Sequence, residues 1–199
     1  MNYAALYGRI LRKVDDQSYL PLVDSVADAA QRQALQPFQQ MMLSRDFDAA
    51  LVLEMLSGLA AAGRIDRVIH LSCQHAVATK QRDHTLAARL VGEQEMAAIE
   101  LGGPNLQSNL ASVERHRGVL AFRLGSYDVA LDYFSRAFER QRSAGNLSNV
   151  LATLIRLGDE GEARELLQQV QRSLPTALVA ELNRLIALDP DLSLLRSEP

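Results

Sequence analysis

The sequence predicts an all-α protein, and three features of its 199 residues support that class. Residues that favour helix, above all Ala, Leu, Gln, Glu and Arg, make up most of the chain. Runs of Val, Ile, Tyr and Phe with the period-two alternation of a half-buried strand are not apparent. Similar helical hairpin patterns recur along the chain, as in a short solenoid whose stacked helix pairs share one core. We therefore expect an α-α superhelix of about four helical hairpins.

The composition argues against several classes of function. The formal net charge of -3 does not fit the broad positive surface that duplex nucleic acid requires. Cys73 is the single cysteine of the sequence, which excludes an internal disulfide framework and a Cys pair for structural zinc. The first residues lack a basic segment followed by an apolar run, and no stretch approaches the roughly 18 apolar residues of a membrane span. We expect a protein of a bacterial-type cytoplasm that neither binds nucleic acid nor inserts into a membrane.

Residues 1–20 are expected to form an N-terminal arm that contains a helix near 2–14. Its apolar residues recur at helical spacing and form one stripe beside a basic group; the stripe is Tyr3, Leu6, Tyr7, Ile10, Leu11 and Val14, and the basic residues are Arg9, Arg12 and Lys13. A repeat array needs a cap at its open end, so this helix either covers the first repeat or forms an interface. The interface would join two copies of the chain as a homodimer, or dock the chain on a partner.

Residues 21–188 are expected to form the repeat domain, which begins with helices near 21–35, 36–44 and 46–62. Phe38 and Met41 lie on the second of these helices. The segment Ser44-Arg45-Asp46-Phe47-Asp48-Ala49-Ala50-Leu51 reads as a turn followed by an aromatic and a small residue at the start of the next helix. Ala50 is the small residue that we expect at a close contact between helices.

The clearest hairpin lies between residues 105 and 143, where we expect helices near 105–124 and 126–143. Its central part reads RGVLAFRLGSYDVALDYFSRA, from Arg117 to Ala137. Gly118 and Ala121 stand where one helix must approach its neighbour closely, and Leu124-Gly125 ends that helix. On the following helix, one apolar stripe is expected from Tyr127, Ala130, Phe134 and Ala137.

This hairpin resembles the tetratricopeptide repeat (TPR). The family pattern places a Gly in the first helix and a Gly at the turn, followed in the second helix by an aromatic, an Ala, an aromatic and a second Ala. All six positions match here, although Ala121 stands where the family usually has an aromatic residue, which leaves a gap that a neighbour must fill. The resemblance is specific over residues 105–175 and implies that the whole array is of TPR type.

A second copy follows, with helices expected near 146–157 and 159–173. The turn recurs at Leu157-Gly158-Asp159-Glu160, and Pro175 closes the unit. Ala163 repeats the small residue, while Leu167 and Val170 replace the aromatic and the last Ala. Ala130 and Ala163 are 33 residues apart, close to the family period of about 34.

The spacing also predicts a degenerate repeat between the N-terminal hairpin and residue 105. Ala50 and Ala130 are 80 residues apart, or two longer periods of about 40, which places helices near 64–80 and 82–101. Ala87 and Ala88 then fall near the small position, and Gly102-Gly103-Pro104 supplies a stop and restart. The competing assignment takes residues 59–65 as the turn within a repeat. It leaves helix 82–101 without a partner, so we favour the first assignment.

The C-terminal part is expected to close the array. Residues 176–187 have apolar residues on one side and polar residues on the other, as a capping helix requires. The last residues, 189–199, are expected to form a frayed tail.

By resemblance to the family, binding takes place on a concave surface lined by the first helix of each hairpin. The residues implied on that surface are Ser112, Arg115, Val119, Phe122 and Arg123 on one helix, and Ser148, Asn149, Ala152 and Arg156 on the next. Three arginines and an asparagine on one surface suit an acidic segment or a C-terminal carboxylate. The alternative is that these arginines are ordinary solvated or locally paired charges.

These features predict a protein-binding adaptor or regulatory scaffold that holds a peptide or protein partner in its groove. An alternative is a TPR-type chaperone that holds a secreted or assembled client protein, and a helical enzyme is less favoured. The sequence has no Gly-x-Ser-x-Gly, no His-Glu-x-x-His and no phosphate-binding loop of Walker type, and Gly102-Gly103-Pro104 is better explained as a turn. We therefore expect no catalytic residues and no cofactor.

Two clusters of possible metal ligands have simpler explanations. His70 and Cys73 are three residues apart and share a helix face, whereas His75 points away and His84 lies on the next helix. A buried or half-buried cysteine with surface histidines explains the same residues. Glu93, Glu95 and Glu100 lack the Glu-x-x-His pairs of a di-iron bundle and are expected on a solvated face. We therefore expect no metal site.

Overall fold

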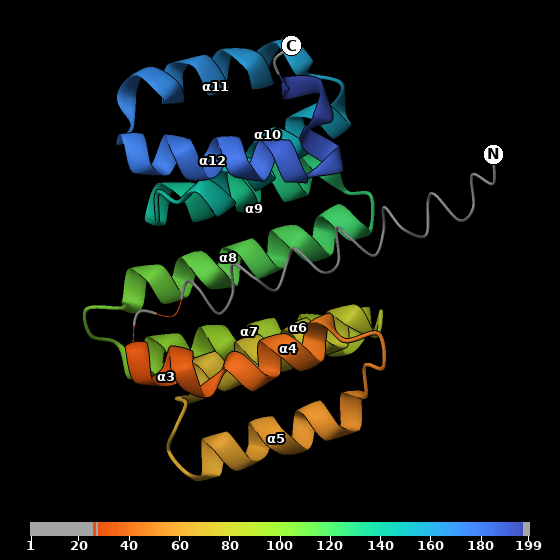
Figure 1. The fold of residues 1–199 in the computed structure, drawn as a ribbon, viewed down its shortest axis with the longest axis vertical. Helices are drawn as coiled ribbons and strands as arrows, with labels where there is room; N and C mark the ends of the chain where they lie inside the picture. The colour runs from red at the N-terminus through yellow and green to blue at the C-terminus, as the bar shows by residue number, and fades with distance from the viewer. Residues whose placement is uncertain (1–25, 27, 197–199) are drawn as a thin grey trace, which may run out of the picture. The chain divides into compact units, whose positions relative to one another are not determined.

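The computed structural model describes residue 26 and residues 28–196, and every regular element in them is a helix (Figure 1). The predicted all-α class is confirmed for this part of the chain. The chain divides into two compact units, unit 1 (Met1–Gly102) and unit 2 (Gly103–Pro199), so the predicted repeat domain of 21–188 spans both. The predicted arm of residues 1–20 lies outside the described residues. None of the described helices combines the length and the apolar content needed to cross a bilayer.

The boundary between the units falls at the predicted stop, Gly102-Gly103. Both glycines have positive φ, 58° for Gly102 and 72° for Gly103. Only glycine adopts such angles without a steric cost, so two of them in succession end α7 sharply. This boundary is therefore a consequence of the local sequence.

The described part of unit 1 is formed by α3 (Ala29–Ala34), α4 (Gln36–Leu43), α5 (Ala49–Ala61), α6 (Arg67–Lys80) and α7 (His84–Leu101). Four of these helices begin after an aspartate whose carboxylate accepts an amide N–H of the first turn; the aspartates are Asp28, Asp48, Asp66 and Asp83. The predicted helices 36–44, 46–62, 64–80 and 82–101 therefore match the observed ones with small shifts at their ends.

The core of unit 1 is apolar and lies among α4, α5 and α6. Phe38, Met42 and Leu56 are fully buried there, and Cys73 of α6 belongs to the same cluster. α6 also packs along α7, as the predicted pairing of helices 64–80 and 82–101 requires. A buried polar contact joins this pair, because Gln94 Nε2 donates to Ser72 Oγ at 2.7 Å.

The predicted role of Ala50 is wrong, because Ala50 lies on the exposed side of α5. Asp48 caps the helix and Ala49 is its first residue. Val52, four residues after the cap, is fully buried in its place. Val52 and Leu56 are four residues apart and define the side of α5 that faces the core, and Ala50 lies on the opposite side because two residues turn the helix by about 200°.

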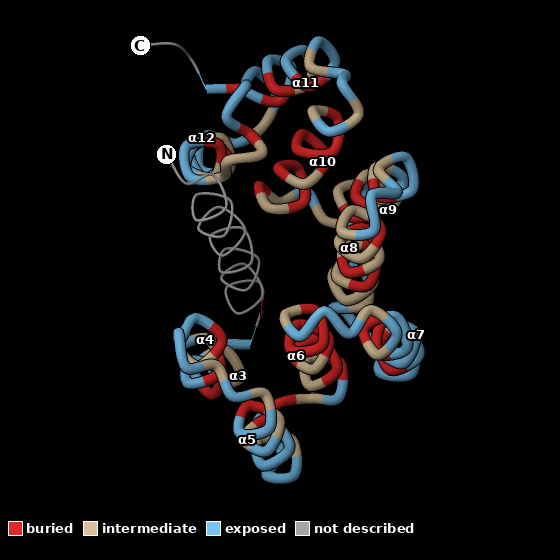
Figure 2. Tube along the Cα trace, turned by 90° about the vertical axis from the view of Figure 1, so that its right-hand side faces the viewer, coloured by how far each residue is buried: buried red, intermediate tan, exposed pale blue. Residues whose placement is uncertain are grey.

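Unit 2 is formed by α8 (Leu106–Arg123), α9 (Tyr127–Arg140), α10 (Ala144–Leu157), α11 (Glu160–Ser173), α12 (Thr176–Leu188) and the 3-10 helix η1 (Pro190–Leu195). α9 packs against both α8 and α10, and α10 also contacts α11, α12 and η1. One apolar core runs through these elements, and it includes Phe134, Leu151, Leu167, Leu182 and Leu192. Figure 2 shows the buried residues on the sides of α9, α10 and α11 that face one another.

The hairpins α8–α9 and α10–α11 have the same turn at a step of 33 residues. Gly125 and Gly158 occupy the left-handed region, with φ of 77° and 89°. The next amide donates back to the preceding helix in each case, Ser126 N to Ala121 O and Asp159 N to Leu154 O, both at 2.9 Å. Ala130 and Ala163 follow at the same distance from the turn, and both are fully buried. The two hairpins are therefore equivalent at the turn and at the small residue that follows it.

Gly118 is required by the close approach of α8 and α9. A Cβ atom on Gly118 would lie 2.5 Å from Cε1 and 2.6 Å from Cδ1 of the Phe134 ring. Real Cβ atoms do not come so close to another heavy atom, so the ring occupies the space that a side chain would need. The expectation that Gly118 permits close helix packing is confirmed.

The expected frayed tail is corrected for residues 190–195. These residues form η1, in which Leu192 is fully buried and Leu195 is buried. Asp189 caps it by accepting the N–H of Asp191 at 2.9 Å. Leu192 and Leu195 are three residues apart, so both reach the core beside α10 and α12. This apolar burial orders a segment that its position in the sequence alone would leave free.

Candidate functional site

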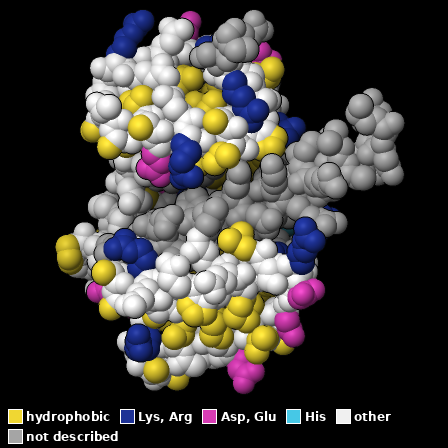
Figure 3. All heavy atoms as spheres, viewed as in Figure 1, with side chains coloured by type: hydrophobic (Ala, Val, Ile, Leu, Met, Phe, Trp, Pro, Cys, Tyr) yellow, Lys and Arg dark blue, Asp and Glu magenta, His cyan; other side chains and the backbone are white. Residues whose placement is uncertain are grey.

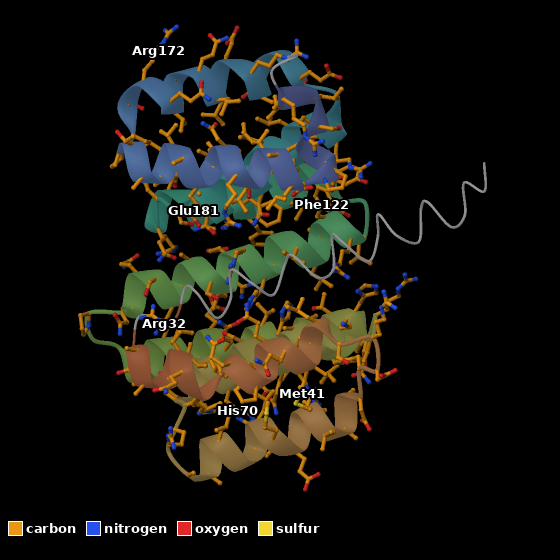
Figure 4. The ribbon with its side chains drawn as sticks, viewed as in Figure 1. Arg32, Met41, His70, Phe122, Arg172 and Glu181 are labelled. Atoms are coloured by element: carbon orange, nitrogen blue, oxygen red, sulfur yellow. The ribbon has the colours of Figure 1, made fainter. Side chains whose placement is uncertain are left out.

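The predicted binding residues of α8 form a stripe with a polar half and an apolar half. Val119 and Phe122 are half-buried and pack against the core of unit 2. The ring of Phe122, labelled in Figure 4, makes an edge-to-face contact with Tyr127, with centroids 5.1 Å apart. Part of the apolar surface predicted for binding therefore stabilises the α8–α9 hairpin.

Arg115, in the polar half, is a half-buried cation with few partners. Its Nη2 lies 3.4 Å from Ser112 Oγ, the long limit of a hydrogen bond. Among the described residues, no carboxylate lies within 4.0 Å of its guanidinium nitrogens. Burial lowers the pKa of Arg115 to about 10, because desolvation penalises the charged form. Most donors of this guanidinium therefore have no acceptor among the residues that the structure describes.

The carboxylate next to Arg115 in the sequence serves the packing of α8 on α9. Glu114 is 7% exposed, and its Oε2 lies 3.9 Å from Arg136 Nε. Arg136 also donates to Asp132 at 2.8 Å and stacks over the ring of Tyr133. Glu114 therefore interacts with α9 and is not part of the predicted binding stripe.

The predicted binding residues of α10 are for the most part already in use. Ser148 and Ala152 are buried, and Ser148 Oγ donates to Gly145 O at 2.9 Å. Asn149 is half-buried, and its backbone carbonyl accepts from Thr153 Oγ1, a contact that does not involve the Asn149 side chain. The guanidinium of Arg156 pairs with Asp191 of η1. α10 is an interior helix of unit 2, so its residues offer a partner less surface than those of α8.

The pairing of Arg156 belongs to a network that holds the C-terminal end of unit 2. Arg196 Nε donates to Ile186 O, and Arg196 Nη2 donates to Asp189 O, each at 3.0 Å. Desolvation raises the pKa of the Asp189 carboxyl, although its hydrogen bond from Asp191 opposes that change. Sequence reasoning missed this site. The available signal was Asp189-Pro190, a cap and a first-turn proline, followed by two leucines at helical spacing.

The cluster around Cys73 is a structural feature of unit 1. Cys73 is fully buried, and burial raises the pKa of its thiol far above the ordinary value. Burial also lowers the pKa of His70. The expectation of surface histidines is wrong for His75, which is 3% exposed because α6 is covered on that side as well. No group of three or more His, Cys, Asp or Glu side chains converges on one point within residues 28–196.

Two of the three glutamates of α7 lie on the solvated face that was expected for all three. Glu93 and Glu100 are exposed, and Glu95 is half-buried. Glu93 pairs with Arg89 at 3.5 Å, and Glu100 pairs with Arg67 at 3.0 Å. Exposed pairs of this kind contribute little to stability and define no site.

Comparison with known proteins adds no family assignment. No protein-family model, no curated protein and no solved structure matches this chain. The candidate site therefore consists of what the chain itself provides, which is the polar half of the α8 stripe around Arg115.

Proposed function

We propose that this chain is a protein-binding module of TPR type, a cytoplasmic adaptor or regulatory scaffold that holds a peptide of its partner along α8. The equivalent turns and buried alanines of α8–α9 and α10–α11 support the repeat part of this proposal. Repeated helix pairs leave an extended surface on which a polypeptide can lie, and they need no cofactor or reacting group to do so.

The observation that carries the binding part of the proposal is the state of Arg115. With the described residues this half-buried cation makes one long hydrogen bond, which does not fully compensate there for its loss of hydration. A carboxylate from a partner would restore that loss through two parallel N–H···O contacts, which is the geometry that a guanidinium prefers. The partner proposed here therefore presents an acidic side chain or a C-terminal carboxylate to Arg115.

A displayed library of random peptides tests this function directly. Selection on the intact protein is expected to enrich acidic peptides, and Arg115→Gln is expected to weaken their binding. A hydrogen bond to a charged group contributes about 1.5–3 kcal/mol, which corresponds to a Kd roughly ten- to a hundredfold higher. Arg115→Lys keeps the charge but loses the two parallel N–H donors of the guanidinium. Its Kd should therefore lie between those of the unchanged protein and Arg115→Gln.

Arg172→Gln provides the matched control. Arg172 is an exposed arginine of α11, labelled in Figure 4, and its replacement removes the same charge at a different place. Circular dichroism and thermal melting should be the same for both glutamine variants. If Arg115→Gln retains the enriched peptides as well as Arg172→Gln does, Arg115 is not the binding residue. If no peptide is enriched at all, the binding function itself is rejected.

A further inference from the structure

The outer face of α7 combines small residues with large apolar side chains that are exposed. This face, here called the α7 face, consists of Thr85, Ala88, Gly92, Met96 and Ile99, which follow one another at intervals of three or four residues. Met96 and Ile99 keep 57% and 56% of their surface exposed. The opposite side of α7 is buried, and Figure 2 shows the exposed residues on the side away from α6.

Hydrophobic side chains at another surface of unit 1 are arranged differently. Those that Figure 3 shows in this unit gather along the border between α4 and α5, where two helices pack on each other. Met96 and Ile99 lie instead on the outer face of a single helix. The α7 face is therefore not the edge of a packed helix pair.

α11 occupies the equivalent place in its own hairpin, and its outer face is polar. α7 and α11 follow the same turn, and the buried Ala87 and Ala163 align the two helices. The residues of α11 that correspond to Ala88, Gly92 and Met96 are Arg164, Gln168 and Arg172, all of them exposed. A surface helix normally has such polar residues on its outer face, whereas an apolar outer face is normally covered. The α7 face therefore has the composition of a covered surface.

Gly92 provides separate evidence, because the packing of unit 1 does not require a glycine there. Apart from its own helix, a Cβ atom on Gly92 would meet nothing within 4 Å, whereas at Gly118 the Phe134 ring occupies that space. Gly92 also lies inside α7 and has no positive φ. Glycine inside a helix lowers stability relative to alanine. What the missing side chain does provide, in the middle of an exposed face, is room for a second backbone to come close.

The α7 face is complementary in shape to a second copy of itself. Its first half is small and its second half is large, with Gly92 between them. In an antiparallel pair with a twofold axis at Gly92, Met96 lies against Ala88 of the second copy and Ile99 lies against Thr85, because each residue meets the one at the same distance beyond the axis. Large side chains then fill the space beside small ones at both ends of the contact.

The charges beside the α7 face agree with the same pairing. Arg89 and Glu93 are exposed along one edge of it and pair with each other at 3.5 Å. The twofold axis places this edge of both copies on the same side, where Arg89 lies about 3 Å along the helix from Glu93 of the second copy. Of the other charges on α7, Glu100 pairs with Arg67 at 3.0 Å, and Glu95 is half-buried. The turn before α7 adds one charge of each sign, those of Arg82 and Asp83.

We propose that two copies of this chain associate through α7, as an antiparallel pair whose twofold axis passes Gly92. The contact covers Met96 and Ile99 of both copies, and it uses the same face twice, so the assembly closes at two. It belongs to unit 1 and does not involve Arg115. Self-association and peptide binding therefore succeed or fail independently.

Sedimentation equilibrium of the unchanged full chain tests the assembly. One helix from each copy makes a small interface, below about 1,200 Å² in total, so a Kd on the order of 10 μM is expected. The mass should rise with concentration from 22.0 kDa toward twice that value. A mass that stays at 22.0 kDa up to about 1 mM overturns the proposal.

Cysteine pairs test the axis and the direction of the helices. Gly92→Cys brings two thiols together at the axis, whereas Thr85→Cys places them about 21 Å apart, because each lies seven residues from the axis. Both positions are exposed, and Cys73 needs no replacement because it is fully buried. Under mild oxidation the covalent dimer should form on the order of tenfold faster with Gly92→Cys. Equal rates in the two variants would mean random collision or a parallel pair, and either rejects the proposed contact.

A glutamine at the axis separates this face from any other surface of self-association. Gly92→Gln should leave the circular dichroism spectrum unchanged and raise the Kd of the dimer on the order of tenfold or more, because the side chain keeps the two helices apart. Gly58→Gln on α5 is the matched control, since Gly58 is also exposed and its Cβ atom would also meet nothing within 4 Å. It should leave the Kd unchanged. If the two variants dimerise equally well, the dimer does not use α7 and the proposal is wrong.

Discussion

The α6–α7 hairpin of unit 1 and the two hairpins of unit 2 share one backbone turn but not one sequence. In each, a residue with positive φ is followed directly by the N-cap residue of the second helix. In unit 2 the positive-φ residues are Gly125 and Gly158, and in unit 1 the residue is Arg82, with φ of 62°. The amide after it donates five residues back in all three, and the small residues that follow, Ala87, Ala130 and Ala163, are all fully buried. The turn therefore persists where its usual glycine has been lost.

The two residues that face each other across the helices of a hairpin also differ from one hairpin to the next. Gly118 faces Phe134 in α8–α9, and the positions at the same distance from the turn are Leu151 and Leu167 in α10–α11. In α6–α7 they are His75 and Val91, both buried. A very small residue with a large one, or two residues of intermediate size, fills a similar space. The hairpin therefore requires a pair of side chains of matched size rather than one particular residue at either position.

The largest effect is expected from a change to one member of that pair. Gly118→Leu forces a side chain into the Phe134 ring and should lower the free energy of unfolding by about 3 kcal/mol, as overpacking does. Adding Phe134→Leu reproduces the pair found in α10–α11 and should recover at least half of that loss. Urea titration followed by circular dichroism measures both. A double variant no more stable than Gly118→Leu would show that the hairpins do not exchange pairs.

Smaller effects are expected at the turns, with opposite signs in the two units. Gly125→Ala and Gly158→Ala should each lower stability by about 1 kcal/mol, since a Cβ atom is strained at positive φ. Arg82→Gly should raise stability by about 0.5 kcal/mol, because relief of strain is partly offset by the flexibility of glycine in the unfolded chain. The same titration measures these changes. A loss of stability in Arg82→Gly would mean that the Arg82 side chain contributes more than its backbone costs.

The smallest effect is a pH dependence that belongs to unit 1. Burial lowers the pKa of His70 below its ordinary value of 6.5, so the unfolded chain takes up this proton more readily than the folded chain. The contribution of His70 is therefore fully present above pH 6.5 and is lost as pH falls through the folded pKa. His70→Gln should make the loss of stability below pH 6.5 less steep. Parallel curves for the two proteins from pH 8 to pH 5 would contradict this assignment.

Local sequence signals are sufficient for most helix boundaries. Aspartate caps and glycine turns act on neighbouring residues, so the turns at Gly125 and Gly158 and the stop at Gly102 can be identified directly. The pairing of α6 with α7 follows from counting residues between turns, although its own turn contains Arg82. The degenerate repeat can be found from the spacing of the turns, because that spacing is kept better than the residues found in each turn.

The errors arise where the environment depends on residues far away in the chain. α5 turns Val52 and Leu56 toward the core and leaves Ala50 exposed, and that choice of side depends on the helices packed against α5. Arg156 was predicted on a binding surface, but it pairs with Asp191 of η1. That pairing depends on the packing of η1 against α10, which neither segment predicts alone. Of the predicted site, Val119 and Phe122 of α8 pack against the core of unit 2, and Ser148, Ala152 and Arg156 of α10 are used by the fold.

The sequence by itself determined the helical class, the glycine turns and the helix stop at Gly102-Gly103, because these depend on backbone preferences that act over a few residues. The tertiary structure decided which faces are covered and which charges are paired. Burial is the sum of contacts from several helices, so the contrast between Arg115 and Arg156, and between the outer faces of α7 and α11, emerges only when those helices are packed together.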